Sequence, residues 1–276
     1  MVAKLTSGEE WEDDPQNNVH TPDGRSELLH VRAKANPQRR ALAKRPAAAY
    51  ATEIYGNGME RVAYTLGSAL GLPIPGTYLE EVLGHPSTVQ DRVPNARTHH
   101  QVGTAPMMAS NVTNLQSIGG LAVLFDIWMA NTDRHANNLL YEPMPDGAKP
   151  GKAIGSKLWL IDHGQCGLFP AWKWDANRDP HDIPLDIADV RGELIPAAED
   201  KIRSLMPKMY RQAFVLLDDA ARQPLLDAIR NVEDDAIDQA VNEIPAAYFT
   251  TQQATTTASF LKARRDVIDK VVTTNW

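Results

Sequence analysis

The chain has 276 residues, of which 43% are hydrophobic and 23% are charged, and its formal net charge is −7. This is an ordinary globular composition, and no segment reaches the roughly 20 consecutive apolar residues that a bilayer span needs. The negative charge argues against broad nucleic-acid binding, and the single Cys166 excludes an internal disulfide. The start of the chain is acidic, whereas a secretory signal needs basic and apolar residues. We therefore expect a soluble, cytoplasmic protein and do not expect nucleic acid as a partner.

The first third of the chain predicts a β-rich unit. Residues 1–20 are polar and acidic and are predicted to form a poorly ordered lead-in. Strands are predicted over residues 26–35 and 40–45, joined by an Asn-Pro turn. The resulting hairpin ends at Lys44.

A helix is predicted after Pro46. Gly71 and Pro73 end it, and Gly56 and Gly58 weaken its first half. Its apolar face consists of Tyr55, Met59, Val62, Leu66 and Leu70.

The middle of the chain predicts a short strand over residues 77–83 and then a hinge within 84–113, which is rich in turn formers and shows no clear period. Residues 118–130 are apolar nearly all round, which predicts a buried central helix. Because an unpaired buried carboxylate is costly, Asp126 in this helix requires a partner such as Arg134 or His135.

The remainder predicts a polar break over 131–138, two strands over 139–141 and 157–161, and mostly helices from residue 183 onward. The Pro/Gly/Lys-rich segment 142–156 between the two strands is predicted to be a dispensable surface loop. Strands first and helices later indicate the α+β class.

Two short segments carry the candidate chemistry. They read Asn131-Thr132-Asp133-Arg134-His135-Ala136-Asn137-Asn138 and Leu160-Ile161-Asp162-His163-Gly164. Phosphoryl transfer from ATP requires metal ligands and a base that are held in fixed positions. The carboxylate of Asp162 and the amide oxygen of Asn138 suit Mg²⁺, which leaves Asp133 to accept a hydroxyl proton.

A lysine and a glutamate commonly complete such a site by holding the nucleotide phosphates. Lys44 ends a predicted strand, and Glu53 follows it in the next predicted helix. Lys34 competes with Lys44 for the phosphates. Glu60 competes with Glu53 because the two lie seven residues apart and share a helix face.

The pattern Asp133-Arg134-His135-x-x-Asn138 with Asp162-x-Gly164 resembles the catalytic and metal-binding loops shared by phosphatidylinositol kinases and HipA-like kinases. Gly71-Leu72-Pro73-Ile74-Pro75 makes the HipA-like branch the closer resemblance, which covers roughly residues 26–272. It implies Asp133 as catalytic base and Asn138 and Asp162 as magnesium ligands. His135 joins the catalytic set as a contact to phosphate or substrate, with bracing of its loop as the alternative.

The resemblance implies a two-lobed protein-kinase-like fold, with a small β-rich lobe over 21–84 and a larger helical lobe over 85–276. It implies ATP and Mg²⁺ as cofactors and a serine or threonine of a protein as acceptor. A lipid or small-molecule alcohol as acceptor, and a pseudokinase without turnover, are the alternatives.

Three departures from kinase patterns are visible. No G-x-G-x-x-G loop precedes the hairpin, where the nearest turn is Thr21-Pro22-Asp23-Gly24. His163 stands where many kinases carry Phe. The extra amino-terminal domain of the HipA toxins is missing, so a toxin role is not implied. Near the other end, Arg264 and Arg265 are predicted to form a solvated helix face.

Overall fold

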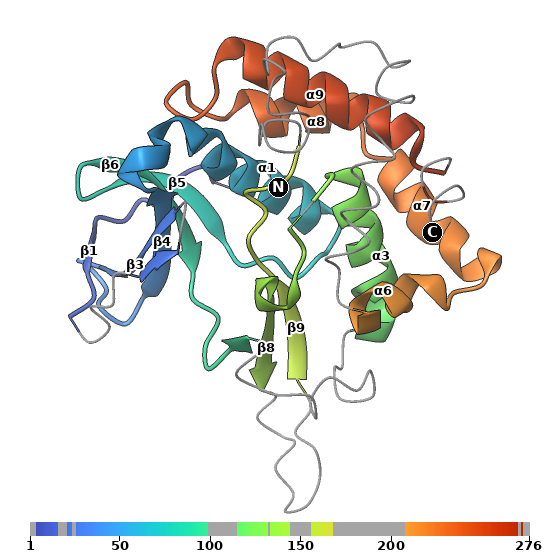
Figure 1. The fold of residues 1–276 in the computed structure, drawn as a ribbon, viewed down its shortest axis with the longest axis horizontal. Helices are drawn as coiled ribbons and strands as arrows, with labels where there is room; N and C mark the ends of the chain where they lie inside the picture. Colours follow the sequence, from blue (N-terminus) through green and yellow to red (C-terminus); the bar gives the residue numbers. More distant parts are fainter. Residues whose placement is uncertain are drawn as a thin grey trace, which may run out of the picture.

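The computed structural model describes residues 4–15, 21–23, 26–98, 115–131, 133–143, 156–167, 208–269 and 272. Most strands gather at one side of the molecule and several helices at the other, with a small β-ribbon between them (Figure 1). No helix in this part of the chain is both long and apolar enough to cross a membrane. The structure thus has the mixed α and β content that the sequence predicts.

Within the described residues, the larger sheet is antiparallel and has the order β1-β3-β4-β6-β5, with β2 also paired to β3. Its strands are β1 (Trp11–Asp13), β2 (Thr21–Asp23), β3 (Ser26–Ala33), β4 (Arg40–Pro46), β5 (Thr77–Val82) and β6 (His85–Asp91). The predicted hairpin of β3 and β4 is confirmed. Because side chains alternate along a strand, Ala41 and Ala43 face a small apolar core, whereas Lys44 lies on the opposite face.

The start of the chain is better ordered than predicted. Residues 11–13 pair with β3, and Trp11 is buried, so part of the expected lead-in belongs to the sheet. Leu5 contributes its carbonyl to the amide of Leu79 on β5, and Glu80 accepts hydrogen bonds from the Ser7 amide and the Trp11 indole. Residues 5–13 therefore link the two edges of a curled sheet.

The boundary predicted between residues 84 and 85 is wrong. It separates β5 from β6, which pair along their whole length through a tight turn. Leu83 and Gly84 adopt positive φ in this turn, the left-handed conformation that a tight hairpin demands. The predicted hinge region 84–113 therefore begins with a strand, while residues 99–114 lie outside the described part of the chain.

Helix α1 (Tyr55–Ala69) follows the short 3-10 helix η1 (Ala48–Ile54) and packs against β5 and β6. The glycines in its first half serve close packing. A Cβ at Gly56 would lie 3.0 Å from the carbonyl oxygen of Gly164, and one at Gly58 would lie 2.3 Å from the ring of Phe249. The absence of side chains at these two positions lets α1 lie close to its neighbours, although glycine has a low helix propensity.

The second half of the fold is built around the buried helix α3 (Leu115–Trp128), as predicted. Helices α6, α7 and α9 pack against α3, and α8 packs against α1 and α9. Their bounds, with those of the smaller sheet and a 3-10 turn, are β7 (Arg97–Thr98), η4 (Ala136–Asn138), β8 (Leu139–Pro143), β9 (Ser156–Leu160), α6 (Lys208–Val215), α7 (Asp219–Arg230), α8 (Asp234–Asn242) and α9 (Thr251–Asp266). The predicted loop 142–156 lies mostly outside the described residues.

One continuous apolar core joins α1, α3 and the carboxy-terminal helices. Tyr55 of α1 stacks on Phe249 at a centroid distance of 4.8 Å. Arg264 is only 1% exposed and donates from Nε to the carbonyl of Ile127 at 2.7 Å. The prediction of a solvated face at Arg264 is therefore wrong, because this arginine satisfies a carbonyl at the end of α3.

Candidate active site

A buried arginine holds the loop that follows α3. Arg134 donates from Nε and Nη2 to the two carboxylate oxygens of Asp126, at 2.8 and 3.0 Å. Asn131 and Tyr210 also donate to this carboxylate, at 2.8 and 2.9 Å. The predicted pairing of Asp126 is confirmed, with Arg134 as its partner, and the buried charge is compensated by four hydrogen bonds.

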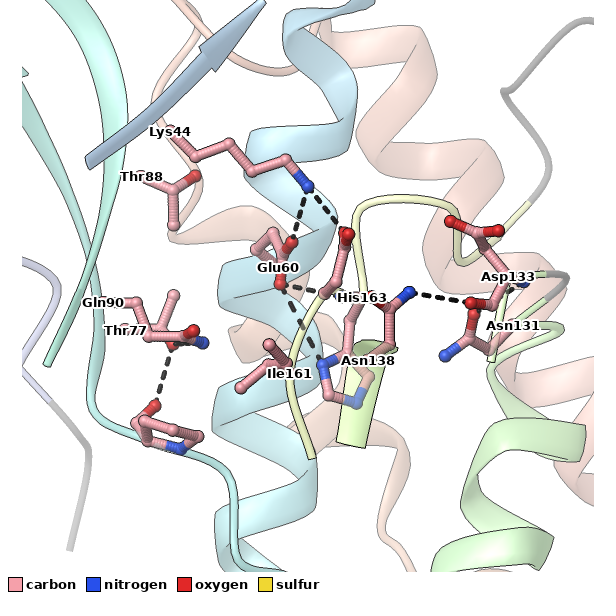
Figure 2. Close-up of polar contacts among 12 residues, drawn as sticks. Lys44, Glu60, Thr77, Thr88, Gln90, Asn131, Asp133, Asn138, Ile161 and His163 are labelled. Atoms are coloured by element: carbon pink, nitrogen blue, oxygen red, sulfur yellow. Dashed lines mark hydrogen bonds and ion pairs between the residues drawn. The ribbon is translucent and has the colours of Figure 1, made fainter. Parts of the chain in front are cut away.

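The same loop carries the predicted base and the predicted amide ligand. Asn138 Nδ2 donates to the carbonyl of Asp133 at 2.8 Å, which leaves the Oδ1 oxygen of Asn138 available as an acceptor. Asn131 Oδ1 accepts from the amide of Asp133 at 3.1 Å. Backbone and side-chain bonds therefore fix Asp133 and Asn138 relative to one another, as Figure 2 shows.

His135 lies at the edge of this loop. Its Nδ1 accepts from the amide of Asn137 at 3.2 Å and caps η4, and its Nε2 lies 3.8 Å from the Asp133 carboxylate. Of the two predicted roles, bracing of the loop has contacts in the structure, and a contact to substrate stays a prediction.

The second loop follows β9 and carries Asp162. This residue has a φ of 58°, in the left-handed region that Asp and Asn tolerate better than most residues. The next residue, His163, is fully buried, and its amide donates to Glu60 Oε2 at 2.8 Å. Gly164 lies against Gly56 of α1, where a Cβ on Gly56 would lie 3.0 Å from the Gly164 carbonyl oxygen. The loop is therefore docked on the first turns of α1.

Lys44 joins these loops to the larger sheet. Its Nζ donates to Asp162 Oδ1 at 2.6 Å and to Glu60 Oε1 at 3.3 Å. Figure 2 shows Lys44 of β4 and Glu60 of α1 pointing toward one another. The structure thus gathers a lysine and two carboxylates beside Asp133 and Asn138.

The structure places Glu60, and not Glu53, beside Lys44. Glu53 lies in η1, before α1 begins, whereas Glu60 lies on the buried face of α1 and reaches Lys44. Lys34 lies at the surface and pairs with Glu10 at 3.1 Å. Only one of the two competing lysines therefore reaches the predicted site residues.

Burial and charge set the protonation states of the lysine cluster. Burial opposes the charge on Lys44, but the carboxylates of Asp162 and Glu60 outweigh it and raise the lysine pKa. Burial also acts against ionisation of Asp162, yet Lys44 lowers the pKa of this carboxyl to about 2. Burial raises the pKa of Glu60 to about 7, partly offset by Lys44. At neutral pH an ionised Asp162 therefore faces a charged Lys44.

Asp133 has a raised pKa, because it is partly buried and lies close to the carboxylate of Asp162. A carboxylate with a raised pKa accepts a proton more readily than an ordinary carboxylate does. Its environment is therefore suited to a general base.

The donor set fits a magnesium ion that is shared with a nucleotide. No group of three or more His, Cys, Asp or Glu side chains could hold a metal alone in the described part of the chain. Mg²⁺ is commonly held by one or two carboxylates, with phosphate oxygens and waters completing the octahedron. The carboxylate of Asp162 and Oδ1 of Asn138 match that requirement.

The buried His163 makes stability depend on pH. Burial, with the charge of Arg134, lowers its pKa from 6.5 to about 3. Below pH 6.5 the unfolded chain binds a proton at this imidazole that the folded chain does not bind, so stability falls as the pH falls. Between pH 7 and pH 5 we expect the free energy of unfolding to decrease by about 2 kcal/mol from this group.

Urea denaturation of the parent and of His163→Gln at several pH values tests this. Glu60, whose raised pKa gives the opposite slope, is present in both proteins, so the test is the difference between them. The difference in unfolding free energy between the parent and His163→Gln should change by about 2 kcal/mol between pH 7 and pH 5, whereas the difference between the parent and His85→Gln, at an exposed position, should stay constant. Equal slopes in the parent and in His163→Gln would contradict the expected neutral imidazole.

Comparisons with known proteins bear on the fold. No protein-family model matches the sequence, and no curated protein matches it significantly. The structure is similar to the crystal structure of the proinflammatory kinase CtkA of Helicobacter pylori, with a TM-score of 0.57, 14% identity, and coverage of 100% of this chain and 98% of that one. It also matches HipA of Shewanella oneidensis, which was solved with HipB and operator DNA, at a TM-score of 0.47 and 13% identity over 94% of this chain and 68% of that one. The chain therefore shares its fold with the kinase CtkA.

Proposed function

We propose that this protein is a two-lobed, Mg²⁺- and ATP-dependent kinase that transfers the γ-phosphate to a serine or threonine hydroxyl of a protein. The observation that carries the proposal is that Lys44, Glu60 and Asp162, from a strand, a helix and a loop, lie in contact. An ATP-dependent activity fits a cytoplasmic protein, and the net charge of −7 favours a protein acceptor over nucleic acid.

In the proposed reaction, Lys44 neutralises charge on the nucleotide phosphates, and Glu60 keeps its ammonium oriented. Asp162 and Asn138 would hold magnesium, which when bound compensates the phosphate charge. Asp133 accepts the proton of the acceptor hydroxyl. The hydroxyl oxygen forms a bond to the γ-phosphorus, the bond to the bridging β–γ oxygen breaks, and ADP leaves.

The ion pair between Lys44 and Asp162, at 2.6 Å, is explained by the proposed reaction. Without a nucleotide, the two opposite charges compensate one another. With Mg-ATP bound, the phosphates would take the place of the carboxylate beside Lys44, and Asp162 would be available to hold the metal. The resting ion pair thus keeps both groups charged and close to their proposed ligands.

Incubation of the purified protein with γ-labelled ATP and Mg²⁺, alone and with a cell lysate, tests the proposal. We expect label on serine or threonine of protein, and about a hundredfold less or lower still with Asp133→Asn. Label in the lipid extract would instead identify a lipid acceptor. Nucleotide binding without any labelled product would identify a pseudokinase.

Lys44→Met should reduce turnover by about a hundredfold and weaken ATP binding, because it removes the cation proposed for the phosphates. Lys34→Met is the matched control, since Lys34 makes only an exposed ion pair, with side chains 53% and 81% accessible. Steady-state kinetics and calorimetric titration of ATP measure both variants. If Lys34→Met abolishes turnover and Lys44→Met does not, the lysine assignment is wrong.

A further inference from the structure

Arg134 uses every N–H of its guanidinium in contacts with fixed geometry. Nε and one N–H of Nη2 bind the carboxylate of Asp126. Nη1 donates to the carbonyls of Asn138 and Ile161, both at 2.6 Å, and the remaining N–H of Nη2 points to Nε2 of His163 at 2.8 Å. Arginine has five such donors and lysine has three, so lysine cannot reproduce this set.

The two carbonyls belong to the two loops of the site. One is that of Asn138, and the other is that of Ile161, which precedes Asp162. The amide of Ile161 also donates to the Asn138 carbonyl, at 3.2 Å. A single side chain, itself anchored on α3 through Asp126, therefore spans the backbones that carry both proposed magnesium ligands.

The contact to His163 fixes the state of the imidazole. Because a guanidinium can only donate, Nε2 of His163 must accept, and the ring proton resides on Nδ1. Nδ1 is buried without a hydrogen-bond partner among the described residues and lies 3.9 Å from Glu60 Oε2. The ring packs edge-on against Phe125, with 6.1 Å between the ring centroids. An apolar residue at this position would leave one buried N–H of Arg134 without an acceptor.

We propose that Arg134 is a positioning residue that sets the spacing of Asn138 and Asp162, and that His163 completes its coordination as a neutral acceptor. The inference rests on the proposed function in assigning magnesium to these two residues. Groups that orient metal ligands typically change metal affinity by about 10–100-fold when they are lost.

Two substitutions at His163 separate positioning from folding. His163→Gln places an amide oxygen within reach of Nη2, whereas His163→Leu has similar bulk and no acceptor. Both replace a fully buried side chain. Arg264→Gln is the control outside the site, because it removes an equally buried arginine that bonds a helix carbonyl.

The measurement is calorimetric titration of ADP at increasing Mg²⁺ concentrations, at a temperature where every variant is folded. We expect His163→Leu to need about tenfold more Mg²⁺ for the same ADP affinity, and His163→Gln to resemble the parent. Arg264→Gln should lower the melting temperature without changing the Mg²⁺ requirement. A parental Mg²⁺ requirement in His163→Leu overturns the inference.

A second readout does not depend on a nucleotide. Nitrogen-15 NMR of the imidazole should show the Nδ1–H tautomer of His163 in the parent, and the Nε2–H tautomer would overturn the inference. If the parent binds Mg-ADP and the variants behave as expected but no acceptor is phosphorylated, the proposed transfer fails and the positioning role stands. If transfer occurs and His163→Leu keeps the parental Mg²⁺ requirement, the positioning role fails alone.

Discussion

Asp133→Asn is expected to keep nucleotide binding and lose phosphoryl transfer, whereas Asp162→Asn loses both. A proposed base acts only when the acceptor hydroxyl is in place, so its loss should lower turnover by about a hundredfold or more. A proposed metal ligand is needed to hold the nucleotide itself. Asparagine tolerates the positive φ of 58° at residue 162, so this substitution removes charge with little backbone strain.

Thermal unfolding with and without Mg-ADP separates the two aspartates. At about 100 times the dissociation constant, a ligand adds about 2.7 kcal/mol of stability, which raises the melting temperature of a domain of this size by a few degrees. Asp133→Asn should keep most of this shift, and Asp162→Asn should lose it. If Asp162→Asn shows the parental shift and parental turnover, the metal assignment is wrong.

Asp126→Leu is expected to lower the free energy of unfolding by about 3–5 kcal/mol, the range found when one partner of a buried ion pair is removed. The substitution leaves the Arg134 guanidinium buried without its counter-charge, and it removes the acceptor of Tyr210 and Asn131. Urea denaturation monitored by circular dichroism provides the measurement.

Asp227→Leu is the matched control for that substitution. Asp227 pairs with Arg230 at the same N–O distance of 2.8 Å, but both side chains are substantially exposed, at 48% and 36%. We expect the free energy of unfolding to change by less than about 1 kcal/mol, because solvent screens the charges of an exposed ion pair and its loss therefore costs little stability. Similar losses of unfolding free energy at Asp126 and Asp227 would show that burial does not make the Asp126–Arg134 pair more important for stability than an exposed pair.

Local patterns predicted much of the fold. The hairpin of β3 and β4, the apolar face of α1 and the buried helix α3 follow from side-chain periodicity, which depends on neighbours in the sequence. The partner of Asp126 could be predicted because a buried carboxylate is too costly to leave unpaired. The two loops of the site could be predicted from their residue types and spacing, although their roles stay proposals.

The predictions were wrong where contacts between residues distant in the sequence determine the structure. Strand β1 has three residues and acidic neighbours, and its order depends on pairing with β3. Strand β6 begins with turn-forming residues, so its pairing with β5 has no strong local signal. Glu53 and Glu60 would lie on the same face of a regular helix, so the sequence pattern does not distinguish them. The structure does, because α1 begins at Tyr55, after Glu53. These features depend on tertiary packing, which overrides local propensity.

The linkage of the sheet edges by residues 5–13 has a consequence for how the protein folds during synthesis. The amide of Ser7 and its acceptor Glu80 are 73 residues apart, so the segment is made long before its partner. At ribosomal rates of about 5–20 residues per second, it waits roughly 4–15 s for β5 to be translated. During that interval the edge of β3 can already be covered by β1, while the contacts to β5 cannot yet form. The curled sheet is therefore completed late, because residues 5–13 are translated well before their partners on β5.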